Sequence, residues 1–236
     1  MITASCRAEN AFGSVVFSRR LHWSGDDLST LKGRRVLVVC HGSANSGSEL
    51  VRLANEIANR THASYDAWVL FAWPGGSTGV AYLGTKFLSV RRAAKFLAEA
   101  IDEIGAEGPL TIDVDAHSLG VPIALEAYLQ TDSVVDGLWL KAGACSRDLS
   151  KYADEAREWG TSVNVFYSPR DLIVSVLYRI WFGFSGALGA YGEKSKGGNI
   201  GVQWDVTSEI KGSHIDYRRC SIVIQAMFEE AKRRLG

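Results

Sequence analysis

The segment around Ser118 holds the residues best suited to do chemistry. It reads VDAHSLG over residues 114–120, with an apolar run before it and a helical pattern after it. We therefore expect Ser118 at the apex of a sharp strand-to-helix turn, where the small residues Ala116 and Gly120 leave room for the two elements to converge. Such a turn presents a serine hydroxyl beside the first amides of a helix. The pattern predicts that Ser118 is a nucleophile.

A serine hydroxyl needs a histidine to accept its proton and a carboxylate to orient that histidine. Asp171 and His214 follow later in the chain, each placed after a predicted strand. The pattern favours them as the acid and the base. Asp148 is a second candidate for the acid, because it follows the strand after the turn. We expect His117 to pack beside the turn and not to act as the base.

The surrounding sequence predicts elements that could position these residues. Short apolar runs alternate with longer helical patterns, which is typical of a mostly parallel sheet with helices on both faces. We expect about seven or eight strands in this α/β architecture. Strands are predicted at residues 35–40, 67–72, 110–116, 137–142, 162–167 and 201–206, an antiparallel edge strand at 13–17, and helices at 48–59, 80–104, 149–159 and 217–234 and directly after Ser118.

Composition excludes several classes of function. The 236 residues carry 26 basic and 26 acidic side chains, so no strong field suggests nucleic acid as a partner. The four cysteines lack the paired short spacings of a zinc site or a disulfide framework. The N-terminus has no secretory pattern, which predicts a cytoplasmic protein, and arginine and glycine interrupt residues 172–191 too often for a transmembrane segment. We expect residues 1–236 to form one domain.

With Ser118, Asp171 and His214 in this order, the chain resembles the serine α/β-hydrolases, near their small lipase-like and esterase-like members. The resemblance runs from the His41-Gly42 loop to the last helix. It implies an oxyanion hole built from the backbone N–H of Leu119 and that of Ser43 or Ala44. It also implies a small-molecule or lipid-like ester as substrate, and no metal or organic cofactor. The oligomeric state is left open.

Two positions depart from the family pattern. Ala116 replaces the first glycine of the G-x-S-x-G motif, and a residue of this size fits because the position requires only a small side chain. Asp113 and Asp115 lie in a strand that should be buried, on the same face as His117. Buried carboxylates need partners. Arg91, Arg92 or a backbone N–H are the candidates.

Alternatives stay open at the level of function. A thioesterase, an amidase or an acyltransferase would use the same three residues, and a binding module could keep the fold without turnover. The stretch within residues 175–200 is rich in aromatic residues and glycine. It could form a lid or an acyl-binding wall over the site, or a packed excursion that carries a short helix.

Overall fold

A sheet of eight strands forms the centre of the molecule, in the order β2-β1-β4-β3-β5-β6-β7-β8. The computed structural model describes residues 1–9, 15–42, 47–75, 81–178, 186–195 and 200–235. Within the sheet only the β1–β2 pair is antiparallel. The strands are β1 (Ile2–Glu9), β2 (Val15–Gly25), β3 (Arg35–Cys40), β4 (Ala67–Ala72), β5 (Thr111–His117), β6 (Gly137–Lys141), β7 (Ser162–Tyr167) and β8 (Val202–Asp205).

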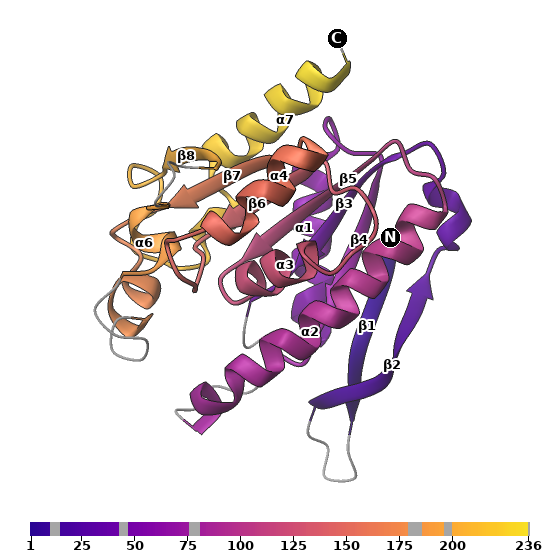
Figure 1. The fold of residues 1–236 in the computed structure, drawn as a ribbon, viewed down its shortest axis with the longest axis horizontal. Helices are drawn as coiled ribbons and strands as arrows, with labels where there is room; N and C mark the ends of the chain where they lie inside the picture. The colour runs from indigo at the N-terminus through magenta and orange to yellow at the C-terminus, as the bar shows by residue number, and fades with distance from the viewer. Residues whose placement is uncertain (10–14, 43–46, 76–80, 179–185, 196–199, 236) are drawn as a thin grey trace.

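Helices cover both faces of this sheet (Figure 1). One face packs against α2, α3 and α4, and the other packs against α1 and α7. The described helices are α1 (Gly47–Thr61), α2 (Ala81–Ala106), α3 (Gly120–Tyr128), α4 (Ala153–Trp159), α6 (Leu188–Tyr191) and α7 (Ser221–Leu235), with short helical turns η1 (Leu28–Leu31), η2 (Ser150–Tyr152), η3 (Ile173–Leu177) and η4 (Asp216–Arg218).

Alternation along the central strands explains why the core has two halves. In β3, Val36 and Val38 pack on the α2 side, while Leu37 and Val39 pack on the α1 side. Each of these side chains is almost fully buried, as expected for a parallel strand covered on both faces. The sheet is thus a rigid platform whose carboxyl ends can carry a site. The predicted mostly parallel sheet with helices on both faces is confirmed.

The N-terminal edge of the sheet differs from the prediction. Of the edge strand predicted at 13–17, residues 15–17 are the start of β2, which runs on to Gly25, and residues 13–14 lie outside the described residues. Strand β1 was not predicted; it lies between β2 and β4 and pairs in parallel with β4. Its buried residues are Ile2, Ala4 and Cys6, and two of these three are small. The alternation is therefore too weakly apolar to indicate a strand from sequence.

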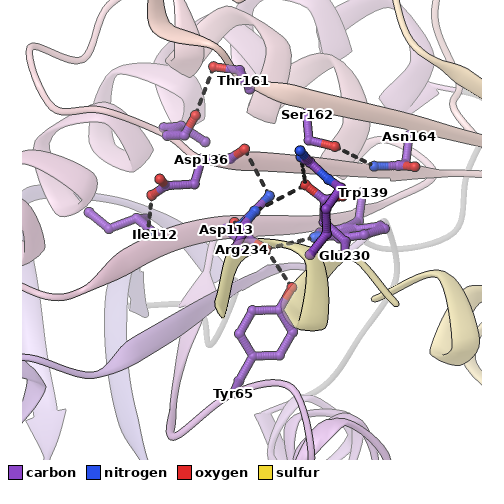
Figure 2. Close-up of polar contacts among 12 residues, drawn as sticks. Tyr65, Ile112, Asp113, Asp136, Trp139, Thr161, Ser162, Asn164, Glu230 and Arg234 are labelled. Carbon is purple, nitrogen blue, oxygen red and sulfur yellow. Dashed lines mark hydrogen bonds and ion pairs between the residues drawn. The ribbon is translucent and has the colours of Figure 1, made fainter. Parts of the chain in front are cut away.

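Asp113 of β5 is the centre of a buried polar cluster far from the Ser118 end of the strand (Figure 2). Its Oδ1 accepts a hydrogen bond from Arg234 of α7 at 2.7 Å. Its Oδ2 accepts from the Tyr65 hydroxyl at 2.6 Å and from the Trp139 indole at 3.1 Å. Arg234 also donates to the backbone oxygen of Asp136 at 3.0 Å. The cluster ties α7 to the middle of the sheet.

The expected partners of the two strand carboxylates were wrong. Arg234, Tyr65 and Trp139 satisfy Asp113, and Lys141 of β6 pairs with Asp115 at 2.6 Å. Arg91 and Arg92 lie on α2, on the opposite side of the sheet. Asp113 shares the face of His117, as expected: Tyr65 and Trp139, which bond Asp113, and Tyr217, whose ring lies beside that of His117, belong to one core cluster on the α1 and α7 side. The partners of these carboxylates could not be predicted from the sequence, because they come from distant parts of the chain.

Candidate active site

Ser118 occupies the turn between β5 and α3. Its φ of 57° lies in the left-handed region, which costs a residue other than glycine about 1–2 kcal/mol. Two backbone bonds to a neighbouring segment stabilise the turn, besides the one from Val121 of α3: the Ser118 N–H donates to the Lys141 carbonyl at 2.9 Å, and the Ala144 N–H donates to the Ser118 carbonyl at 3.1 Å. Strand β6 and the loop after it thus hold both polar groups of the Ser118 backbone.

Two glycines make the turn possible because other backbone passes close to them. A Cβ atom built on Gly120 would lie 2.4 Å from the Cys40 carbonyl oxygen and 2.7 Å from that of His41. One built on Gly42 would lie 3.0 Å from the Ser118 Cβ and 3.3 Å from Nδ1 of His117. The loop after β3 therefore presses against the turn. Ala116, in contrast, is fully buried in β5.

The structure brings Asp171 and His214 together. Asp171 follows β7 and is fully buried, and its Oδ2 lies 2.7 Å from Nδ1 of His214. Its Oδ1 accepts the backbone N–H of Ile173 at 3.1 Å. An ionised carboxylate only accepts hydrogen bonds, so Nδ1 of His214 carries the hydrogen and Nε2 keeps its lone pair. That Nε2 is buried and has no hydrogen-bond partner among the residues that the structure describes.

The other candidates for acid and base are engaged elsewhere. Asp148 is exposed, and its Oδ1 accepts the Ser150 N–H at 3.0 Å. His41 accepts the Trp73 N–H on Nε2 at 3.2 Å and donates from Nδ1 to the Gly42 carbonyl at 2.6 Å. Burial lowers the pKa of His41 to about 3. His41 therefore shapes the loop beside the turn, and its imidazole has no free nitrogen for a substrate.

His117 joins the turn to the loop that carries His214. Its Nε2 lies 2.8 Å from the His214 backbone oxygen, and the two imidazole rings are 4.7 Å apart. Burial, and after it the electrostatic effect of His214, Arg218 and Lys141, lowers the pKa of His117 well below its usual value. His117 does pack beside the turn as predicted, but its bond to the backbone of His214 was not foreseen.

Beneath this contact lies a buried ion pair. Lys141 and Asp115 are 3% and 2% exposed, and Lys141 pairs in the sheet with His117. Buried charges are costly unless they are paired, and here the Nζ to Oδ2 distance is 2.7 Å. The sequence shows no sign of this pair, because a lysine at the end of a strand usually reaches solvent.

Leu119 lies at the N-terminus of α3, where backbone N–H groups have no partner within the helix. Its N–H makes no hydrogen bond to a residue that the structure describes. This agrees with a free donor beside Ser118, at the positive end of the helix dipole. Ser43 and Ala44, predicted as the second donor, lie outside the described residues.

A pocket of about 300 Å³ opens beside the turn. Apolar side chains of α3 and α2 form much of its wall, together with the loop after β6 and Tyr178 beyond η3. Leu119, which follows Ser118 in the chain, and Ala144, whose N–H bonds the Ser118 carbonyl, both line it. Its lining comprises Val90, Arg91, Leu119, Pro122, Leu125, Glu126, Ala144, Cys145, Ser146, Asp148, Leu149, Lys151, Tyr152 and Tyr178.

The segment predicted as a lid or packed excursion is described in part. Residues 179–185 and 196–199 lie outside the described residues. Between them, α6 packs against Val174 in a small apolar cluster with Ala187 and Ala190. The Gly189 carbonyl accepts a bond from the Ser168 N–H at 2.9 Å. This described portion is a packed excursion that carries a short helix. A lid role for the segment stays a prediction.

Two searches of the described residues concern other kinds of site. No group of three or more histidine, cysteine or acidic side chains there could hold a metal ion. No helix in the described part of the chain has the length and hydropathy needed to cross a membrane.

Comparisons with known proteins place these features in context. No curated protein matches the chain. Among solved structures, an uncharacterized protein from Bacillus cereus ATCC 10987 is 13% identical with a TM-score of 0.42, over 61% of this chain and 44% of that one. A Trichoderma reesei cutinase, solved in complex with a phosphonate inhibitor, is 12% identical with a TM-score of 0.41, over 84% of this chain and 77% of that one. The chain thus spans less than half the length of the Bacillus protein.

A family model gives the firmer result. It is described as an alpha/beta hydrolase of unknown function (DUF900), and it matches residues 18–181, which is more than half of the chain. The matched region runs from β2 through the Ser118 turn to Asp171 and η3, and it ends before His214. The chain therefore belongs to this family of α/β hydrolases.

Proposed function

We propose that the protein is a serine hydrolase that cleaves carboxylic esters through an acyl-enzyme intermediate. The observation that carries the proposal is the Asp171–His214 pair, which leaves Nε2 of the histidine buried and without a partner among the described residues. Ser118 lies at the strained turn, and its neighbour His117 links the turn to the His214 backbone. The order of the three residues along the chain also fits an α/β-hydrolase triad.

In the proposed mechanism, His214 accepts the hydroxyl proton of Ser118 while the serine oxygen attacks the ester carbonyl. Asp171 keeps Nδ1 of His214 protonated and stabilises the imidazolium that forms. The Leu119 N–H, with Ser43 or Ala44 as the second donor, stabilises the oxyanion. His214 returns the proton to the leaving alcohol. A water, activated by His214, then releases the acyl group and restores Ser118.

The pocket supports an ester with an apolar group. Val90, Leu119 and Leu125 are apolar and belong to its wall, and a volume of about 300 Å³ is at the lower end of the range for small-molecule sites. We propose that the acyl chain or the alcohol chain of the substrate binds there. A thioesterase, amidase or acyltransferase would use the same machinery with a different leaving group or acceptor, and a non-catalytic binding module is the alternative from another class.

A fluorophosphonate probe tests the proposed nucleophile. The wild type should be labelled, and Ser118→Ala should lose labelling and hydrolysis of p-nitrophenyl esters while its circular dichroism spectrum stays the same. Ser146→Ala is the matched control, because this serine also lines the pocket but lies outside the triad. Equal labelling of wild type and Ser118→Ala would refute the proposal.

A panel of substrates separates the related activities. Esters, thioesters and anilides of the same acyl chain, each with and without an added alcohol acceptor, should show fastest turnover with the ester and water. Faster thioester cleavage, or transfer to the alcohol, would move the assignment to a thioesterase or an acyltransferase. A folded protein without any turnover or labelling would favour the binding module.

A further inference from the structure

We propose that His117 is a positioning residue for the base: its Nε2–H holds the His214 carbonyl and so fixes the loop that carries the catalytic imidazole. This inference rests on the proposed function, because it assigns His214 the role of base. It concerns a residue that touches neither substrate nor reacting atoms.

The geometry supports a direct hydrogen bond. Nε2 of His117 lies 2.8 Å from the His214 backbone oxygen. A carbonyl oxygen only accepts, so the proton of a neutral His117 must be on Nε2. The His117 side chain is 8% exposed, so water cannot easily replace the bond. A His214 loop without this anchor would hold its imidazole only through Asp171.

The surroundings of His117 favour the neutral form that the bond requires. The groups that face it are His214, Tyr217, Arg218, Lys141 of β6 and Asp115 of its own strand. Burial and the three nearby basic groups lower its pKa well below the usual value. During turnover His214 becomes an imidazolium. A neutral ring 4.7 Å away does not repel that charge, whereas a second imidazolium would.

Gly42 holds the other side of the same ring. A Cβ atom at this position would lie 3.3 Å from Nδ1 of His117 and 3.0 Å from the Ser118 Cβ. The ring is thus confined between the loop after β3 and the loop that carries His214. His117 directly precedes the nucleophile Ser118 and is bonded to the backbone of the base His214. A shift of His117 would therefore change the position of the base relative to the nucleophile.

Two substitutions separate the hydrogen bond from simple packing. His117→Met keeps a side chain of comparable length without a donor, and His117→Gln places an amide N–H near the position of Nε2. We expect His117→Met to lower kcat by about 10- to 100-fold with a KM changed less than about twofold, because misplacement of a catalytic group acts on the chemical step. His117→Gln should recover most of kcat. His22→Gln, which alters a histidine bonded to Ser18 on β2, is the control and should match the wild type.

A measurement on the wild type does not depend on any variant. Nitrogen-15 NMR of labelled histidines should show His117 protonated on Nε2 and not on Nδ1, at neutral pH. The downfield proton resonance of the Asp171–His214 pair should be sharp in the wild type and in His117→Gln. It should broaden in His117→Met, because an unanchored loop exchanges faster.

The outcomes decide between the ideas. Full kcat in a folded His117→Met, equal loss in both folded variants, or a wild-type His117 protonated on Nδ1 would each overturn the positioning role. If His117→Met does not fold, the tautomer and the kcat of His117→Gln decide. A wild type without ester hydrolysis or probe labelling would refute the proposed function, and the NMR measurements would still test the anchor.

Discussion

His41 illustrates how a histidine beside the candidate active site can be fixed in one state. Both ring nitrogens are bonded to backbone, and the ring stacks on Trp73 with centroids 5.4 Å apart. Burial lowers its pKa to about 3, whereas an unfolded chain would show a pKa near ~6.5. The imidazole therefore stays neutral through the range in which a catalytic base titrates.

This difference predicts acid destabilisation. Between pH 6.5 and about 3, which are the ordinary and the lowered pKa values, the unfolded chain binds a proton that the folded protein excludes, so the free energy of unfolding falls as the pH is lowered. The neutral His117 acts with the same sign. Urea denaturation should show that the free energy of unfolding falls less between pH 7 and pH 5 in His41→Asn than in the wild type. The exposed His62 supplies the control, and an equal loss in His41→Asn and His62→Asn would contradict the prediction.

At the scale of elements, the chain positions each candidate residue at the carboxyl end of a parallel strand or in a loop beyond one. The central strands were predictable because both of their faces are buried and their runs are apolar. Strand β1 was not, because its buried residues Ile2, Ala4 and Cys6 form only a weakly apolar alternation. Asp171 and His214, which were predicted as acid and base from their order after Ser118, lie in contact. The Lys141–Asp115 pair depends on the register of β5 against β6, and the hydrogen bond of His117 depends on the path of the loop that carries His214; sequence patterns specify neither.

The Lys141–Asp115 pair couples these two strands. Removing one partner leaves a buried charge alone, so Asp115→Leu or Lys141→Met should each lower the free energy of unfolding by about 3–5 kcal/mol. The double variant should be closer to the wild type than either single variant, because it leaves no unpaired charge. Urea denaturation of all four proteins measures the coupling. Additive losses in the double variant would show that the two charges do not compensate each other.

Helix α2 contributes Val90 to the pocket wall. Val90→Phe should narrow the pocket and shift the preferred p-nitrophenyl ester towards shorter chains, with kcat/KM for the longest esters lowered by about tenfold or more, the equivalent of about 1.4 kcal/mol. Val51→Phe, on an exposed position of α1, controls for the added ring. An unchanged chain-length profile in Val90→Phe would place the substrate chain elsewhere.

At the scale of the whole molecule, Arg234 attaches α7 to the sheet. Arg234→Met should lower the free energy of unfolding by about 3–5 kcal/mol, because it leaves the buried Asp113 without its cation. Arg233→Met is the matched control, since Arg233 is exposed and pairs only with Glu230 among the described residues. Thermal denaturation compares the two. Similar melting temperatures would show that the tyrosine and the indole alone satisfy Asp113.

The attachment of Ser118 to β6 has a consequence for how such a protein could evolve. Its backbone N–H and carbonyl are both bonded to β6 and the loop after it, and Asp171 and His214 lie on other segments. Several pocket walls instead come from α2 and Tyr178, which hold no member of the triad. Mutations there would change which esters fit without moving the proposed triad. Substrate range in descendants of this protein could therefore diverge while the chemistry is inherited unchanged.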